Sequence, residues 1–69
     1  MQIRFIVKKN QVTEQEYTEY FAPGKTFKEI VTNAFPNFFC YADSEEDMFL
    51  DAKMNGDYYA VHAELVQRA

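Results

Sequence analysis

The sequence is poor in the residues that crosslink or sharply bend small proteins. Its 69 residues include one cysteine, one histidine, two glycines, two prolines and no tryptophan. A single cysteine, Cys40, excludes an internal disulfide and favours a reducing compartment, so we expect a cytoplasmic protein. With Gly24 and Gly56 as its only glycines, the chain has no glycine-rich phosphate loop. Seven phenylalanines and five tyrosines must therefore supply most of the buried area.

Long hydrophobic runs are also missing. No apolar stretch approaches the roughly 20 residues that a membrane-spanning helix needs. The apolar run near the N-terminus is short and follows Arg4, which is unlike a signal peptide. We expect a soluble protein with no membrane contact, folded as one small α+β domain over residues 1–69.

Charge is unevenly distributed along the chain. The net charge is −4, yet residues 29–69 carry eight carboxylates against Lys53 and Arg68, a net charge of −6 for that part. A binder of nucleic-acid phosphates needs a basic stripe, so we expect no direct nucleic-acid contact. An acidic surface is compatible with a basic protein partner.

One helix is clearly delimited. Thr26 followed by Glu29 has the spacing of a capping box. Apolar residues then recur at helical spacing in one stripe: Phe27, Ile30, Val31 and Ala34. Pro36 disfavours helical dihedrals at the preceding residue and predicts the helix end. A helix of about ten residues is marginal alone in water, so the stripe is expected to pack on a sheet.

Three segments outside this helix read as strands. Residues 2–8 place alternate apolar side chains on one face, and residues 37–42 carry apolar side chains on both faces, as in a central or covered strand. Residues 14–22 have an ambiguous phase, because Glu19 shares a face with Tyr17. Either Glu19 lies at a sheet edge or a bulge shifts the register.

Residues 48–54 allow two interpretations. Asn55-Gly56 is a strong hairpin signal, and a two-residue turn would place Leu50 opposite Val61 and Phe49 opposite His62. A helix over residues 45–54, ended by the same Asn55-Gly56 pair, is the alternative.

The predicted fold class is α+β, with an antiparallel or mixed sheet, one helix on one face, and the order ββαβββ or ββαββ. Met1-Gln2-Ile3 opens a strand, and Phe21-Ala22-Pro23 leads through Gly24-Lys25 to the helix. In these features the topology resembles β-grasp domains of the ubiquitin-like kind. The chain ends Val66-Gln67-Arg68-Ala69 without a diglycine tail, so the conjugation chemistry of that family is not expected here.

No pattern of catalytic, metal-binding or cofactor-binding residues appears. His62 has no convergent partners in the sequence, and Cys40 lies in an aromatic stretch where it is expected to behave as a small hydrophobe. The acidic run at residues 43–47 lacks the spacing and central glycine of a calcium loop. We therefore expect no enzyme activity, no metal and no cofactor.

The function predicted from these features is protein binding. Leftover aromatics on the sheet face away from the helix (Tyr17, Tyr20, Phe49 and Tyr58) are expected to be exposed or to meet a partner. The predicted partner-binding residues are Asp43, Glu45, Glu46, Asp47, Asp51, Tyr58 and Glu64. Such a module suits an inhibitor or nucleic-acid mimic of phage or mobile-element type that blocks a basic host protein surface. The alternative is a structural homo-oligomer, with a homodimer as its smallest form, that assembles through the exposed sheet face or a strand edge.

Overall fold

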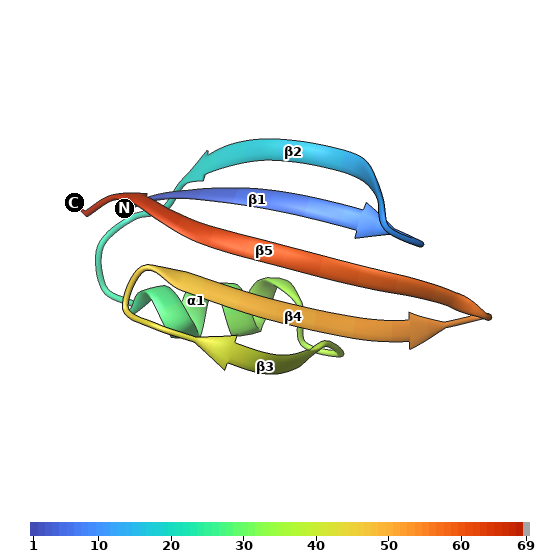
Figure 1. Cartoon of the computed structure of the whole chain (residues 1–69). Helices are drawn as coiled ribbons and strands as arrows, with labels where there is room; N and C mark the ends of the chain where they lie inside the picture. The colour runs from blue at the N-terminus through green and yellow to red at the C-terminus, as the bar shows by residue number, and fades with distance from the viewer. Residues whose placement is uncertain (69) are drawn as a thin grey trace.

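The computed structural model describes residues 1–68 as one open sheet with a single helix (Figure 1). The elements are β1 (Gln2–Lys9), β2 (Val12–Tyr20), α1 (Phe27–Ala34), β3 (Phe39–Asp43), β4 (Asp47–Met54) and β5 (Asp57–Gln67). The strand order is β2-β1-β5-β4-β3, and every neighbouring pair is antiparallel. The predicted α+β class and the order ββαβββ are confirmed.

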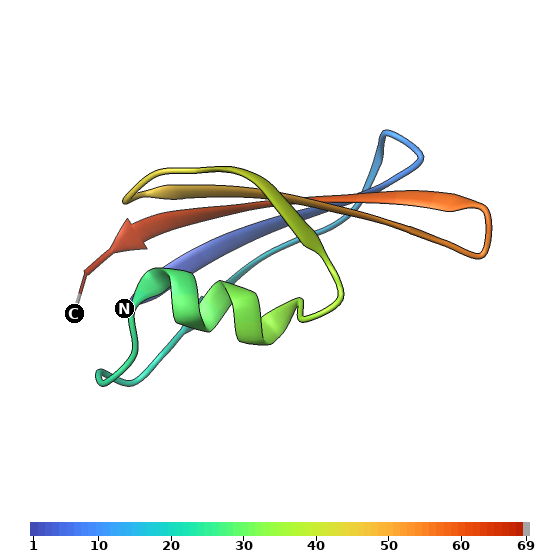
Figure 2. The same ribbon diagram turned by 90° about the horizontal axis from the view of Figure 1, so that it is seen from below.

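The helix connects the two edges of the sheet. It follows edge strand β2, lies across one face, and leads into β3 at the opposite edge, so the other face carries no helix (Figure 2). The predicted capping box is present: the Glu29 N–H donates to Thr26 Oγ1 at 3.2 Å, and the Thr26 N–H donates to Glu29 Oε1 at 3.3 Å. No helix within residues 1–68 is long and apolar enough to cross a membrane.

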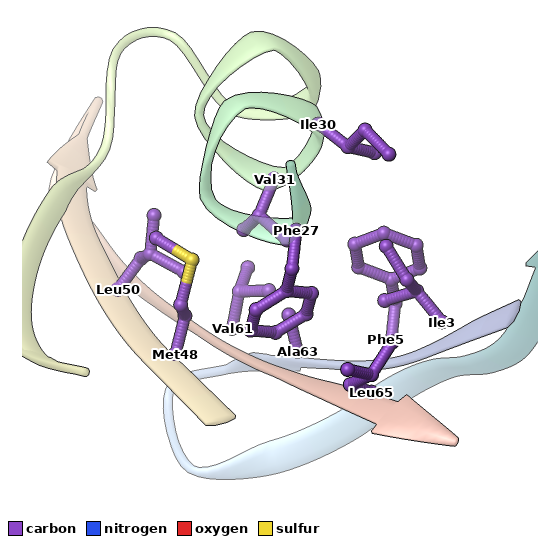
Figure 3. Packing of buried hydrophobic residues seen from close by; sticks show 10 residues of the cluster. All are labelled: Ile3, Phe5, Phe27, Ile30, Val31, Met48, Leu50, Val61, Ala63 and Leu65. Carbon is purple, nitrogen blue, oxygen red and sulfur yellow. The ribbon is translucent and has the colours of Figure 1, made fainter. Parts of the chain in front are cut away.

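The core lies between the helix and the sheet (Figure 3). Its buried members come from α1, β1, β4 and β5: Ile3, Phe5, Phe27, Ile30, Val31, Met48, Leu50, Val61, Ala63 and Leu65. Three members of the predicted helical stripe are buried, but the prediction for Ala34 is wrong, because Ala34 is exposed. Its small side chain lies in the last turn, and Phe35 reaches the core there instead, with its ring centroid 5.7 Å from that of Phe5.

The β4–β5 hairpin decides between the two interpretations of residues 48–54 in favour of the strand. Asn55 and Gly56 both have positive φ, at 53° and 83°, as the predicted two-residue turn requires. The predicted register is confirmed, since Leu50 pairs with Val61 and Phe49 with His62. β5 has 11 residues and forms the centre of the sheet between β1 and β4.

The resemblance to β-grasp domains extends to the order of the elements only. Those domains pair their first and last strands in parallel, whereas β1 and β5 are antiparallel here. The long β5 runs back along both β1 and β4, so that each of its neighbours is joined to it in the antiparallel sense.

The two edge strands of the sheet, β2 and β3, explain two features of the sequence pattern. β2 is an edge strand, and its Glu19 lies exposed opposite Ile3, so the edge explanation for Glu19 is correct. β3 is the other edge strand, which corrects the expectation of a central or covered strand. Phe39 is 68% exposed and Tyr41 is 54% exposed, because nothing covers the open side of β3.

Replacing Ile30 tests the helix packing. Ile30→Ala removes buried methyl and methylene groups and should lower the free energy of unfolding by about 2–5 kcal/mol. Thr32→Ala, on the exposed side of the same helix, is the control and should change it by less than about 0.5 kcal/mol. Urea denaturation of both variants measures the difference, and equal losses would contradict the packing described here.

The β4–β5 turn gives a second prediction. Gly56→Val should cost at least about 1–2 kcal/mol of unfolding free energy, since a β-branched residue resists the positive φ at this position. Asn55→Gly in the same turn should cost much less, because glycine accepts the positive φ of residue 55. A Gly56→Val variant as stable in urea as the parent would rule out this turn geometry.

Candidate functional site

The face of the sheet opposite the helix is the largest uncovered surface of the fold. We call it the open face and define it by the residues of β1, β5 and β4 that alternate with the core positions: Arg4, Ile6, Lys8, Tyr58, Ala60, His62, Glu64, Asp47, Phe49, Asp51 and Lys53. These side chains share a face because paired residues in antiparallel strands point the same way, and the residues between them point to the side of the sheet that carries the helix.

Aromatic rings occupy the middle of the open face. The Phe49 and His62 rings stack in parallel, with centroids 4.4 Å apart and an interplanar angle of 2°. The Tyr41 ring, from edge strand β3, lies 6.3 Å from Phe49. Beside these rings is a shallow hollow of about 310 Å³, lined by Ile6, Lys8, Tyr41, Phe49, Ala60, Val61 and His62. Shape and composition both suit an apolar contact with another macromolecule.

His62 has one polar partner. Its Nε2 lies 2.8 Å from Asp47 Oδ1, and both side chains are partly exposed. The predicted hairpin register placed Phe49 opposite His62, but the contact with Asp47 was not expected. The hairpin register contained the signal, because Asp47 pairs with Glu64 and is therefore the diagonal neighbour of His62.

Cys40 lies on the other side of the sheet from His62. It pairs with the buried Leu50 and packs against the core, whereas His62 is on the open face. The two side chains therefore cannot act together as a nucleophile and base.

The predicted acidic residues separate into three environments. Asp43 lies on the helix side, where its Oδ2 is 3.0 Å from Lys28 Nζ. The hydrogen bond to Asp43 and the attraction of its carboxylate raise the pKa of Lys28 above its usual range, so the lysine remains charged. Asp43 is thus already neutralised by a neighbour, which makes it the least available of the predicted binding residues.

The turn between β3 and β4 carries the second group. Ser44 Oγ accepts from the N–H groups of Glu46 and Asp47 at 3.3 and 3.1 Å, and this holds the turn while the Glu45 and Glu46 side chains are exposed. Asp47 pairs directly with Glu64. We call Glu45, Glu46, Asp47 and Glu64 the acidic end of the sheet. The register places the turn beside Glu64, as expected, and the use of these acids as one binding patch stays a prediction.

Asp51 and Tyr58 form the third environment, farther along the open face. The Tyr58 hydroxyl donates to Asp51 Oδ2 at 2.9 Å. This hydrogen bond, with smaller contributions from burial and from the Asp51 charge, raises the pKa of the Tyr58 phenol. The pair joins the two strands of the hairpin and holds Asp51 in place beside the aromatic rings.

The expected aromatic set is only partly on this face. Tyr58 and Phe49 belong to the open face, and Tyr20 is exposed on β2 opposite Gln2. The expectation for Tyr17 is wrong: its ring stacks on Phe5 with centroids 5.2 Å apart, on the helix side of the sheet. The phase of β2 decides this, because Tyr17 pairs with the buried Phe5.

Comparisons with known proteins identify no protein that is similar to this chain. No protein-family model matches the chain, and no curated protein or solved structure is detectably similar to it. Within residues 1–68, no group of three or more histidine, cysteine, aspartate or glutamate side chains is arranged to hold a metal ion.

The Asp51–Tyr58 hydrogen bond predicts a pH effect. Folding raises the pKa of the Tyr58 phenol. The hydrogen bond therefore stabilises the fold at pH values below the ordinary phenol pKa, and this stabilisation is lost as the pH rises through the raised pKa. Asp51→Asn should therefore lower the pKa of Tyr58, measured by NMR titration of labelled tyrosine. Asp43→Asn, which breaks the ion pair with Lys28, is the control and should leave the Tyr58 titration unchanged. An unaltered Tyr58 titration in Asp51→Asn would show that Asp51 is not the cause.

Proposed function

We propose that this chain is a non-enzymatic protein-binding module that engages a basic surface of its partner through the acidic end. The observation that carries the proposal is the pairing of Asp47 with Glu64, which joins the acids of the turn to those of the central strand. Glu45 and Glu46 are exposed beside this pair and form no ion pair within residues 1–68.

The fold gains little from this arrangement of charge. Carboxylates gathered at one end repel one another and lower stability slightly. The same field attracts a positively charged protein over about a Debye length and speeds its association. Glu45 and Glu46, which are exposed and form no ion pair within residues 1–68, are consistent with a role in binding.

A non-enzymatic role is supported by how the reactive groups are distributed. His62 contacts Asp47 and Phe49, while Cys40 packs on the opposite side of the sheet. General acid–base or nucleophilic catalysis needs such groups to converge on one point. A binding role needs only the exposed surface.

A narrower form of the proposal is inhibition. Carboxylates presented by the turn and by β5 would occupy the place of nucleic-acid phosphates on a basic host protein. This is the mode of action expected of an inhibitor of phage or mobile-element type. The discriminating property is competition: the module and a nucleic acid would exclude each other from the same partner surface.

Charge reversal at the acidic end tests the proposal. The double variant Glu45→Lys with Glu46→Lys should keep the fold, because both side chains are exposed in a turn. Its association with a partner purified from the native host by affinity capture should slow by at least about tenfold at low salt, measured by stopped-flow kinetics. The difference in association rate between the parent and the double variant should decrease as salt is added.

The matched control carries the same change in charge elsewhere. Glu14→Lys with Glu19→Lys reverses two exposed acids of edge strand β2 and alters the net charge equally. The control should associate at nearly the parental rate. Equal slowing by both variants would show that only net charge matters, and no slowing by the first would place the binding surface away from the acidic end.

A further inference from the structure

Most of the open face lies outside the proposed contact, because the acidic end includes only Asp47 and Glu64 of its residues. Phe49, Tyr41 and Ile6 are only partly buried on this face or exposed, and the hollow beside them is open to solvent. Uncovered apolar and aromatic side chains of this kind usually meet another surface. The pattern of charge across the strands identifies that surface.

Charge on the open face is divided by strand. The basic residues Arg4 and Lys8 are on β1, where Arg4 is ion-paired with Glu16 of β2, and β4 carries the acidic residues Asp47 and Asp51 together with Lys53. The central strand β5 separates them, as Figure 1 shows. On the open face, β1 therefore carries a net charge of +2 and β4 a net charge of −1.

The register also aligns these charges in rows across the sheet. Arg4 pairs with Glu64, which pairs with Asp47, and Lys8 pairs with Ala60, which pairs with Asp51. Between these rows lies a third, in which Ile6 pairs with His62 and His62 with Phe49. Each row thus has a β1 residue and a β4 residue at equal distances from β5.

A two-fold axis parallel to β5 would superpose complementary residues. Rotation about this axis lays β1 of one chain over β4 of another and keeps every row at its own level. The facing pairs would be Arg4 with Asp47, Lys8 with Asp51, and Ile6 with Phe49, and each pair would occur twice. A closed two-fold interface requires this kind of self-complementarity.

The other in-plane two-fold axis, perpendicular to the strands, is unfavourable. It would keep each strand over itself and exchange the outer rows, so that Arg4 would face Lys8 and Asp47 would face Asp51. Like charges held opposite each other across an interface oppose association. The charge pattern therefore selects the axis along β5.

The residues on the selected axis are compatible with close approach. Ala60 is small and lets the two sheets approach over the hollow. Aligned sheets cross at about 30°, which shifts the outer rows sideways by roughly 3–4 Å, less than the strand spacing of about 4.8 Å. The facing pairs thus remain within reach of their long side chains.

We propose that the open face binds a second copy of this chain, in a face-to-face homodimer whose two-fold axis runs parallel to β5. The contact shares Asp47 and Glu64 with the acidic end, whereas Glu45 and Glu46 lie in the turn outside the facing rows. The second copy would cover Phe49 and Ile6 and leave that turn free.

The size of the face predicts a reversible dimer. An eight-residue strand is about 27 Å long and five strands span roughly 20 Å, so the facing area is about 500 Å² in projection. Stable interfaces bury about 800 Å² of accessible surface per partner, and accessible surface, unlike a projected area, includes the relief of the side chains. The dimer should accordingly form and dissociate with concentration and should weaken as salt screens its charge pairs.

Sedimentation equilibrium of the purified chain with charge-exchange variants tests the dimer. The parent should pass from 8.1 kDa to twice that mass as its concentration rises. Lys8→Asp and Asp51→Lys should each raise the dimer dissociation constant by at least about tenfold, since each places like charges opposite each other twice. Mixed in equal amounts, the two variants should recover the dimer, because one supplies Lys8 and Lys at position 51 while the other supplies Asp at both positions.

Recovery by mixing depends on contact between positions 8 and 51 of different chains. Lys25→Asp and Glu14→Lys carry the same changes in charge outside the open face and should dimerise as the parent does. Circular dichroism would confirm that every variant is folded, and Lys8→Asp alone suffices to test the contact if Asp51→Lys does not fold. A parent that stays monomeric at every concentration overturns the proposal. So does a dimer that Lys8→Asp does not weaken, or a mixture of folded variants that fails to recover it.

Discussion

The packing of one short helix against one face of the sheet is the contact on which this structure depends. Phe27 and Val31 point from the helix onto the buried side of β1, β5 and β4, and Phe5 lies beside Phe27 (Figure 3). A helix of eight residues is too short to be stable alone, and a sheet of this kind needs one covered face. Each element is therefore stabilised mainly by the other, and the capping box fixes where the helix begins.

The same contact creates the functional surface by leaving it uncovered. A single helix crosses from the β2 edge to the β3 edge on one side only, so every alternate residue of the three inner strands faces outward. Residues 1–68 contain no second helix to cover them. What the outward residues do then depends on their chemistry, which here is aromatic in the middle, basic on β1 and acidic on β4.

The two proposals assign overlapping parts of this surface to different partners. Glu45 and Glu46 in the β3–β4 turn suit a basic protein, the rows of the open face suit a second copy, and Asp47 and Glu64 belong to both. Both follow from the hairpin register, because Asn55-Gly56 determines which residue of β4 lies beside which residue of β5. A dimer would also present two acidic ends at once, which would strengthen binding to a partner with repeated basic sites.

The sequence by itself determined the features that local chemistry controls. The helix start followed from Thr26 and Glu29, and the β4–β5 register followed from a two-residue turn whose residues tolerate positive φ. The fold class and the joining of Asp47 to Glu64 were predictable for the same reason. Features that depend on strand order were not.

Only the tertiary structure decided which strands are edges and which face each side chain meets. β3 has the composition of a covered strand, but its place at the edge exposes Phe39 and Tyr41. The phase of β2 buries Tyr17 against Phe5 and leaves Glu19 in solvent. The opposition of charge between β1 and β4 also arises from the sheet order, since these strands are far apart in the sequence. The physical reason is that strand order is set by non-local pairing with β5, which no local propensity encodes.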